Sequence, residues 1–238
     1  MFHPRKLLRA PILCYVTDRK SLTSELDDRN EALLKRVATA AAAGIDWIQI
    51  REKDLLAKEL SSVTREAVAQ TKQIYERNGQ AARILVNERL DVAYSEGAGG
   101  VHLGEQSLAV VDVSKWLAAK ADLTEHDKFL VGVSCHSVQA AVSAARDGAD
   151  YIFFGPVFAT PSKEALGQPQ GLQRLAEVCS SVEIPVLAIG GITHDNACDC
   201  IGEGAEGVAA IRLFQDAEDV AAVVTELRAK LAFTKAGE

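Results

Sequence analysis

The stretch ARDGADYIFFGPVFATPSK, from Ala145 to Lys163, contains a helix end, a strand and a polar loop in succession. Gly148 is placed to close the helix, because glycine readily adopts the left-handed conformation that ends many helices. The apolar run Tyr151–Phe154 predicts a buried strand, which ends at Gly155. Polar side chains then follow at Thr160, Ser162 and Lys163.

The same joint of helix, glycine and strand occurs three more times. The copies are AAAGIDWIQI (Ala41–Ile50), SEGAGGVHL (Ser95–Leu103) and IGEGAEGVAAI (Ile201–Ile211). Repeated joints of this kind predict alternating strands and helices around a parallel sheet. Eight strands are expected, at Ile12–Thr17, Trp47–Arg51, Arg83–Asn87, Gly100–Leu103, Phe129–Ser134, Tyr151–Phe154, Pro185–Ile189 and Gly207–Ile211.

Apolar residues at helical spacing fill the intervals between these strands. Helices are expected at Asn30–Ala43, Ala57–Asn78, Glu88–Glu96, Val110–Ala121, Ser137–Asp147, Gly171–Ser181, Asp195–Glu203 and Asp216–Leu231. Eight such units in 238 residues favour an α/β protein built as a single (β/α)8 TIM barrel, with its active site at the C-terminal ends of the strands. A doubly wound parallel sheet is the alternative that the pattern leaves open. One domain is expected over residues 1–238, with its first strand near 12–17 and its last helix near 216–231.

The composition narrows the class of partner. The net charge of -7, without a basic stripe, argues against nucleic acid, and no apolar run approaches the roughly 20 residues of a membrane span. The N-terminal residues are a poor match to a signal peptide. Five widely spaced cysteines suit a reducing compartment, so a cytoplasmic protein is expected. The expected partners are small phosphorylated molecules, and the chain is compatible with a homodimer.

Cationic and amide side chains gather at the predicted strand ends. Arg51 and Lys53 leave the second strand on one side, because they are two residues apart in an extended segment. Gln49 shares that side and is expected to lie deeper in the barrel. Lys163 adds a third cation on the sixth loop. Together with Asn87, at the end of the third strand, these groups could surround a diphosphate.

Glycines mark a second anion site after the seventh strand. The segment IPVLAIGGI (Ile184–Ile192) ends its strand in Gly190 and Gly191. Paired glycines before a helix present bare backbone N–H groups, which suit a phosphate. Two anion sites without an obvious nucleophile suggest that a second, phosphorylated substrate displaces diphosphate.

Carboxylates and histidines are placed for two further roles. Glu88 and Glu105, after the third and fourth strands, are candidate ligands for Mg²⁺, which prefers hard oxygen ligands. His136, two residues after Ser134, could act as an acid or a base near neutral pH, and a structural role is equally open. His102 lies between apolar residues and is expected to be structural.

At these positions the chain resembles the superfamily of thiamine phosphate synthases and thiazole tautomerases. The matching blocks are CYVTD (Cys14–Asp18), IQIREK (Ile48–Lys53), ILVNE (Ile84–Glu88), GVHLGEQSL (Gly100–Leu108), VGVSCHS (Val131–Ser137), GADYIFFGPVFATPSK (Gly148–Lys163) and IPVLAIGGI (Ile184–Ile192). The synthases are (β/α)8 barrels that join a hydroxymethylpyrimidine diphosphate to a thiazole phosphate with loss of diphosphate.

The resemblance also implies roles for individual residues. It implies Gln49 for the pyrimidine, and a diphosphate pocket made by Arg51, Lys53, Asn87, Ser134, Thr160, Ser162 and Lys163. Gly191, with the backbone near Ile211 and Arg212, would hold the thiazole phosphate. The departures fall mostly on the metal: Glu88 replaces the usual aspartate, and Ser107 stands where the synthases carry a second one. Arg212 also replaces a residue that is typically small.

Because of these departures, other functions remain as alternatives. The thiazole tautomerases share the barrel, need no Mg²⁺ and use a histidine in the loop where His136 stands. The complete diphosphate set favours the synthase. A barrel that binds ligand without turnover is a further alternative. A phosphosugar aldolase with Lys53 or Lys163 as a Schiff base ranks last, because no apolar pocket to lower a lysine pKa is apparent.

Overall fold

The computed structural model describes residues 10–22, 29–120, 129–160 and 168–234. Within them, eight parallel strands close into a barrel in sequence order, with β8 paired to β1. The strands are β1 Ile12–Val16, β2 Trp47–Ile50, β3 Arg83–Asn87, β4 Gly100–Leu103, β5 Leu130–Cys135, β6 Tyr151–Phe154, β7 Val186–Ile189 and β8 Gly207–Ala210. The predicted (β/α)8 barrel is confirmed, and a doubly wound sheet is excluded because that sheet would have open edges.

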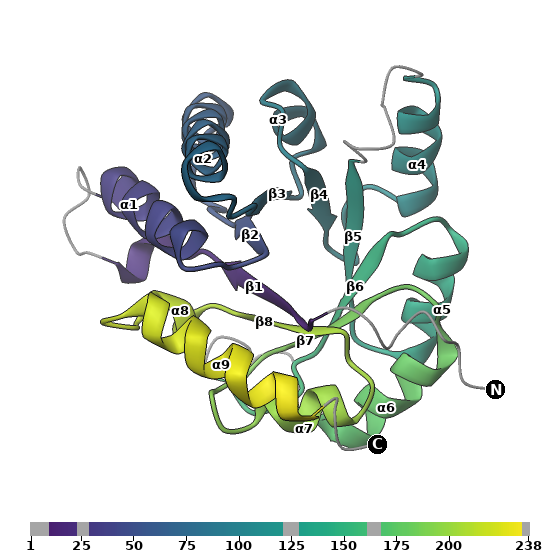
Figure 1. Cartoon of the computed structure of the whole chain (residues 1–238). Helices are drawn as coiled ribbons and strands as arrows, with labels where there is room; N and C mark the ends of the chain where they lie inside the picture. Colours follow the sequence, from purple (N-terminus) through teal and green to yellow (C-terminus); the bar gives the residue numbers. More distant parts are fainter. Residues whose placement is uncertain (1–9, 23–28, 121–128, 161–167, 235–238) are drawn as a thin grey trace.

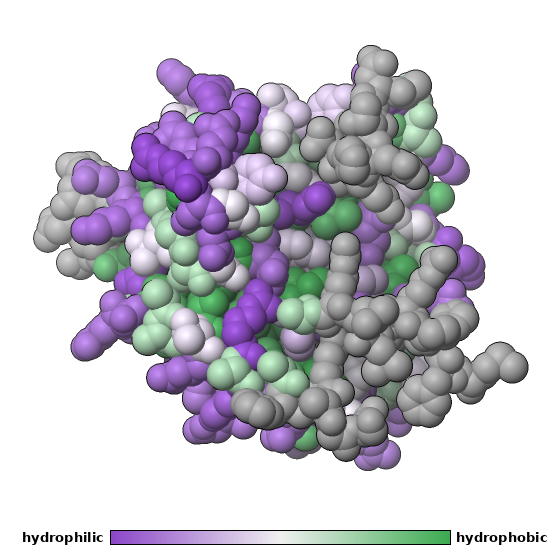
Figure 2. Space-filling view, viewed as in Figure 1, coloured by the Kyte–Doolittle hydropathy of each residue, from purple (hydrophilic) through white to green (hydrophobic). Residues whose placement is uncertain are grey.

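Helices surround the ring of strands (Figure 1). They are η1 Arg19–Ser21, α1 Arg29–Ala42, α2 Ala57–Asn78, α3 Leu90–Ser95, α4 Val110–Ala118, α5 Val138–Arg146, α6 Gly171–Ser181, α7 Ala197–Gly202, α8 Arg212–Gln215 and α9 Val220–Thr234. In the space-filling view, hydrophilic residues cover the outer helices and hydrophobic residues show toward the middle of the face (Figure 2). No helix in the described ranges has an apolar stretch long enough to cross a membrane.

The last helical segment differs from the prediction. A single helix was expected from Asp216, but the short helix α8 directly follows β8, and α9 begins only at Val220. Phe214 and Gln215 are buried, so α8 continues the core beyond the strand. The side chain of Asp219 accepts a hydrogen bond from the backbone N–H of Ala222 at 3.0 Å, which caps the start of α9.

Strands β1 and β2 end one residue earlier than the sequence predicts, and a side chain takes over from backbone hydrogen bonding at the end of β2. Thr17 and Arg51, the expected last residues of the first two strands, lie just beyond β1 and β2. The backbone N–H of Thr17 still donates to the carbonyl of Gln49 at 3.0 Å, but that of Arg51 donates to the Thr17 hydroxyl, also at 3.0 Å. The Thr17 side chain therefore holds the main chain at the point where it leaves β2.

The barrel interior is packed with side chains and is separate from the core beneath the helices. It contains Cys14, Val16, Leu85, Tyr151, Phe153, Leu187 and Ala209. The ring of Tyr151 fills the space that a side chain at Gly132 would need, because a Cβ there would come within 1.9 Å of the ring. Gly148, the glycine of the opening stretch, has a φ of +97°, as predicted for a residue that ends a helix. The filled interior leaves chemistry to the residues at the strand ends.

Candidate active site

Amide groups from two neighbouring strands meet at the C-terminal end of the barrel. Gln49 on β2 is only 2% exposed, and its side-chain N–H donates to Oδ1 of Asn87 on β3 at 3.0 Å. The Asn87 amide donates in turn to the Glu88 carboxylate at 3.2 Å. The expectation that Gln49 lies deep in the barrel is confirmed by its burial, and the structure brings it into contact with Asn87.

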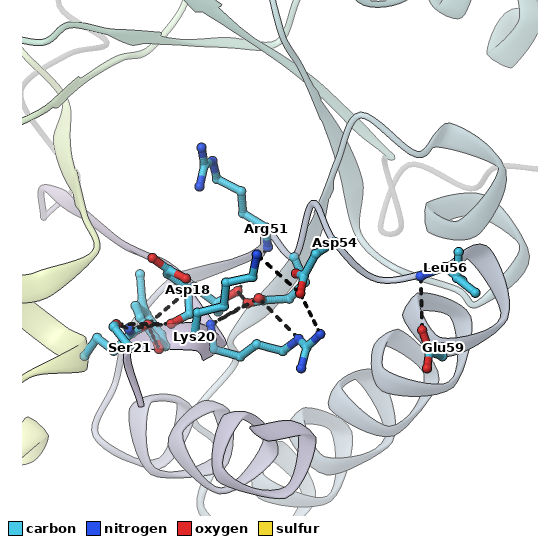
Figure 3. Close-up of polar contacts among 12 residues, drawn as sticks. Asp18, Lys20, Ser21, Arg51, Asp54, Leu56 and Glu59 are labelled. Carbon is cyan, nitrogen blue, oxygen red and sulfur yellow. Dashed lines mark hydrogen bonds and ion pairs between the residues drawn. The ribbon is translucent and has the colours of Figure 1, made fainter. Parts of the chain in front are cut away.

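Arg51 follows β2 and carries a cation without a partner among the described residues. Its side chain extends away from Asp54 and Lys20 (Figure 3), and no ion pair or hydrogen bond to its guanidinium is found in the described ranges. Lys53 differs from its expected placement, because the strand has ended and this residue lies exposed in a turn. The argument from an extended segment therefore holds for Gln49 and Arg51 but not for Lys53.

Ser134 on β5 belongs to a hydrogen-bonded chain inside the barrel. Its hydroxyl lies 2.9 Å from Nε2 of His102, and Nδ1 of the same ring lies 3.1 Å from the hydroxyl of Tyr151. The imidazole also packs on Phe153, with ring centroids 4.2 Å apart. Burial raises the pKa of Tyr151 well above its usual range, so the phenol keeps its proton and can donate it to His102. In the tautomer in which the phenol donates to Nδ1, Nε2–H of His102 donates to Ser134, and the serine hydroxyl can then donate to a substrate.

A cavity of about 260 Å³ lies where β7 and β8 end, at the predicted second anion site. Its lining residues include five of the predicted site residues: Thr160, Gly190, Gly191, Ile211 and Arg212. Gly190 and Gly191 have φ values of +94° and +67°, and the loop after β6 packs against them through a 3.0 Å hydrogen bond from the Phe158 N–H to the Gly190 carbonyl.

The loop after β6 that carries Thr160, Ser162 and Lys163 is only partly described. Thr160 lines the glycine cavity, whereas the family resemblance assigned it to the diphosphate pocket. Ser162 and Lys163 lie outside the described residues, so their predicted contacts stay predictions.

The candidate metal ligands follow two neighbouring strands. Glu88 has a φ of +62°, a conformation that non-glycine residues rarely adopt, and a Cβ at Gly104 would lie 2.8 Å from its Oε1. Such strain is concentrated at functional sites. The Glu105 carboxylate accepts the backbone N–H of His136 at 3.1 Å. Within the described residues, three acidic, histidine or cysteine side chains do not come together to form a metal site. One or two carboxylates are nevertheless enough for Mg²⁺ when substrate phosphates supply the remaining ligands.

His136 bridges two loops of the site. Its Nδ1 contacts the carbonyl oxygen of Gly155, at the end of β6. A carbonyl oxygen can only accept, so Nδ1 carries a proton, and in the neutral ring Nε2 is the basic nitrogen. This contact ties the β5 loop to the β6 loop and also fixes a tautomer that a base could use.

A buried carboxylate next to Arg51 was not predicted. The side chain of Glu52 is 1% exposed. Burial raises the pKa of Glu52, whereas hydrogen bonds from Thr17 and from the backbone N–H of Arg19 lower it. In the sequence, Glu52 belongs to the charged run REKD, which resembles a solvated loop. The available signal was its position, because it alternates with Arg51 and must face the opposite side of the chain.

Comparison with known proteins identifies the family. The sequence model of the family described as thiamine monophosphate synthase matches residues 13–214. The thiamine-phosphate synthase of Methanoculleus marisnigri is 40% identical over 215 residues, which cover 90% of this chain and 95% of that protein. This chain belongs to the thiamine monophosphate synthase family.

Two further relatives are similar to this chain over most of its length, and one of them has a solved structure with the same fold. A putative thiamine-phosphate synthase of Geobacter sulfurreducens is 40% identical over 190 residues, covering 78% of this chain and 83% of that one. The solved thiamine phosphate pyrophosphorylase from Pyrococcus furiosus has a TM-score of 0.76 at 31% identity and covers 96% of this chain and 97% of its own. The family match runs from β1 to α8, so it includes the strand ends that carry the site.

Proposed function

We propose that this protein is a thiamine-phosphate synthase, a transferase of thiamine biosynthesis. It would join 4-amino-2-methyl-5-hydroxymethylpyrimidine diphosphate to a thiazole phosphate and release diphosphate. The observation that supports the proposal is a pair of separate places at the strand ends of a family member that are each suited to an anion. One is centred on the guanidinium of Arg51, which has no partner among the described residues, and the other is the glycine cavity where β7 and β8 end.

The first site suits the diphosphate of the pyrimidine substrate. Arg51, with Lys53 and Lys163, would supply charge-assisted hydrogen bonds that strengthen as charge develops on the leaving diphosphate. Ser134 would donate its hydroxyl to the same group, since His102 can hold it from the other side. Gln49 and its partner Asn87 would contact the pyrimidine and the diphosphate, respectively.

The second site suits the thiazole phosphate. Gly190 and Gly191 carry no side chain beside their backbone N–H groups, and Ile211 lines the same cavity. Arg212, which is exposed and lines the cavity, stands where a small residue is typical and would pair with the phosphate.

Magnesium is part of the proposal, with Glu88 as the principal ligand and Glu105 as the second. Bound Mg²⁺ would neutralise charge on the departing diphosphate. Glu88 fits this role, since its carboxylate lies beside Gly104, where a side chain would crowd it, and Asn87 orients it. Ser107, in place of the usual aspartate, donates its hydroxyl to the Gly104 carbonyl at 2.9 Å, so this structure gives it a structural contact.

A thiazole tautomerase is the second candidate, and His136 is the observation that favours it. The contact of its Nδ1 with Gly155 leaves Nε2 as the basic nitrogen, as a proton-transfer catalyst requires. We place the synthase first because its named relatives match almost the full chain. A regulatory barrel that only binds thiazole or thiamine phosphate would share both anion sites but show no turnover.

We further propose that the protein acts in the cytoplasm. All five cysteines are free thiols in the structure, and four of them are buried, which suits a reducing compartment. A homodimer stays a prediction.

One assay separates these candidates. Purified protein is incubated with the pyrimidine diphosphate and the thiazole phosphate, with Mg²⁺ or with EDTA, and the formation of thiamine phosphate and diphosphate is measured. The synthase predicts Mg²⁺-dependent formation of both products. Proton exchange in thiazole carboxylate phosphate without any thiamine phosphate would instead identify the tautomerase, and binding without either reaction would identify the regulatory protein.

A further inference from the structure

A buried polar cluster joins the ends of β1 and β2 beside Arg51. We name it the β1–β2 clamp; it consists of Thr17, Arg19, Glu52 and Asp54. Glu52 accepts hydrogen bonds from the Thr17 hydroxyl at 2.5 Å and from the backbone N–H of Arg19 at 3.1 Å. The Arg19 guanidinium reaches Asp54 at 3.0 Å. The clamp therefore connects two loops that leave the barrel separately.

The clamp fixes the main chain of Arg51 through one hydroxyl group. Thr17 Oγ1 accepts the backbone N–H of Arg51 at 3.0 Å, and its own proton goes to Glu52. An N–H can only donate, so the Thr17 hydroxyl accepts the Arg51 N–H, and its own proton is directed to Glu52 Oε1, which also accepts the Arg19 N–H at 3.2 Å. With a fixed partner on each side, the hydroxyl is held in a single orientation.

The clamp also keeps nearby acids away from the Arg51 guanidinium. Glu52 and Asp54 are one and three residues away and would be natural ion-pair partners for this cation. Arg19 instead occupies both carboxylates, with Nε 3.8 Å from Glu52 and Nη2 3.0 Å from Asp54. Lys20 adds a second cation, at 3.5 Å from Asp54. The cation of Arg51 is thus left for an external anion.

We propose that Glu52 is a positioning residue that, through Thr17 and Arg19, aims Arg51 at the diphosphate of the substrate. The identity of that anion rests on the proposed function. Glu52 does not touch the substrate in this arrangement, since its side chain is enclosed at the back of the loop. Its effect reaches the substrate only through Arg51.

The test uses binding of inorganic diphosphate to the full chain, measured by calorimetry with Mg²⁺ present throughout. Glu52→Gln replaces one of the two accepting oxygens by an amide NH₂ group, and Thr17→Val removes only the bridging hydroxyl. Each variant is expected to bind diphosphate about tenfold more weakly, as for loss of a buried hydrogen bond to a charged group. Glu59→Gln is the matched control, because this nearby glutamate only caps α2, through the backbone N–H of Leu56 at 3.1 Å (Figure 3). Its diphosphate affinity should equal that of the wild type.

A second arm repeats the substitutions in an Arg51→Ala background. A purely structural role for Glu52 would lower diphosphate affinity by the same factor with or without Arg51, whereas a positioning role leaves nothing further to lose. The inference is overturned by an equal loss in the two backgrounds, or by unchanged affinity in both single variants. Thr17→Val keeps the test decisive if Glu52→Gln does not fold. Turnover by the wild type tests the synthase separately, because a chain that binds diphosphate but forms no product would contradict that function and leave the clamp intact.

Discussion

Substituting Gly191 by alanine tests the second anion site most directly. With a φ of +67°, Gly191 has a conformation that costs a residue with a side chain roughly 1–2 kcal/mol. A Cβ there would also lie 2.7 Å from the carbonyl oxygen of Ala159 and 2.7 Å from Cβ of Phe158. Both neighbours belong to the loop after β6, so relief of the clash requires that loop to move. Overpacking of this kind adds about 1–3 kcal/mol, which gives a total loss of about 2–5 kcal/mol of unfolding free energy.

Gly79→Ala supplies the matched control. Gly79 has a similar φ of +72° at the C-terminal end of α2, but a Cβ there would meet nothing within 4 Å. It should therefore lose only the backbone component, roughly 1–2 kcal/mol. The difference between the two variants, measured by urea unfolding, isolates the cost of pushing the β6 loop away.

The two variants should also differ in KM for the thiazole phosphate. Gly191 lines the cavity assigned to the thiazole phosphate, so moving its wall should raise KM for that substrate by tenfold or more. Gly79→Ala should keep the wild-type KM. The reasoning is refuted if Gly191→Ala is no less stable than Gly79→Ala, or if both variants bind thiazole phosphate equally well.

Three further outcomes are expected from steady-state kinetics. Arg51→Ala should lower kcat/KM by a hundredfold or more with little change in Tm, because its guanidinium has no described protein partner; near-wild-type kinetics would contradict its role. Tyr151→Phe should lower kcat about tenfold, because it removes the hydroxyl proton that, through His102, keeps Ser134 a hydrogen-bond donor. The same substitution in a Ser134→Ala background should cause no further loss of kcat. Glu88→Gln should weaken Mg²⁺ dependence and rate together, while His136→Ala costs little; full activity in EDTA and a dead His136→Ala variant would favour the tautomerase.

The barrel could be predicted because its sequence signals agree at several levels. Four joints of helix, glycine and strand specify where α1, α3, α5 and α7 stop and which strand follows each of them. The predicted start of the last helix was wrong, because Arg212–Gln215 form a separate short helix and α9 begins only at Val220. Asp219, three residues before Ala222, carried the capping signal, whereas Asp216 was taken as the start.

The site was harder to predict because side-chain direction depends on strand register. His102 has apolar neighbours on both sides, so its sequence context does not say which face of β4 it occupies. Register supplies the answer: His102 pairs with Gly132, and Ser134 is two residues further along β5 on the same face. Gln49 was predictable because it alternates with Arg51 and lies two residues further back in the second strand, and its bond to Asn87 satisfies the buried amide.

The two anion sites lie on loops that are far apart in sequence, so buried polar groups must hold them in place. Gln215, at the end of α8, accepts hydrogen bonds from the Tyr15 hydroxyl and from the Asp18 backbone N–H, both at 2.9 Å. Its amide also donates to the Asp18 carbonyl at 2.7 Å. Arg212, which lines the phosphate cavity, lies three residues before Gln215. Thr17, which donates its hydroxyl to Glu52, directly precedes Asp18. Burying a glutamine and a glutamate costs stability unless their hydrogen bonds are satisfied. These bonds link β8 to β1 and β1 to β2, so the spacing between the cavity and Arg51 is set by polar contacts as well as by the sheet.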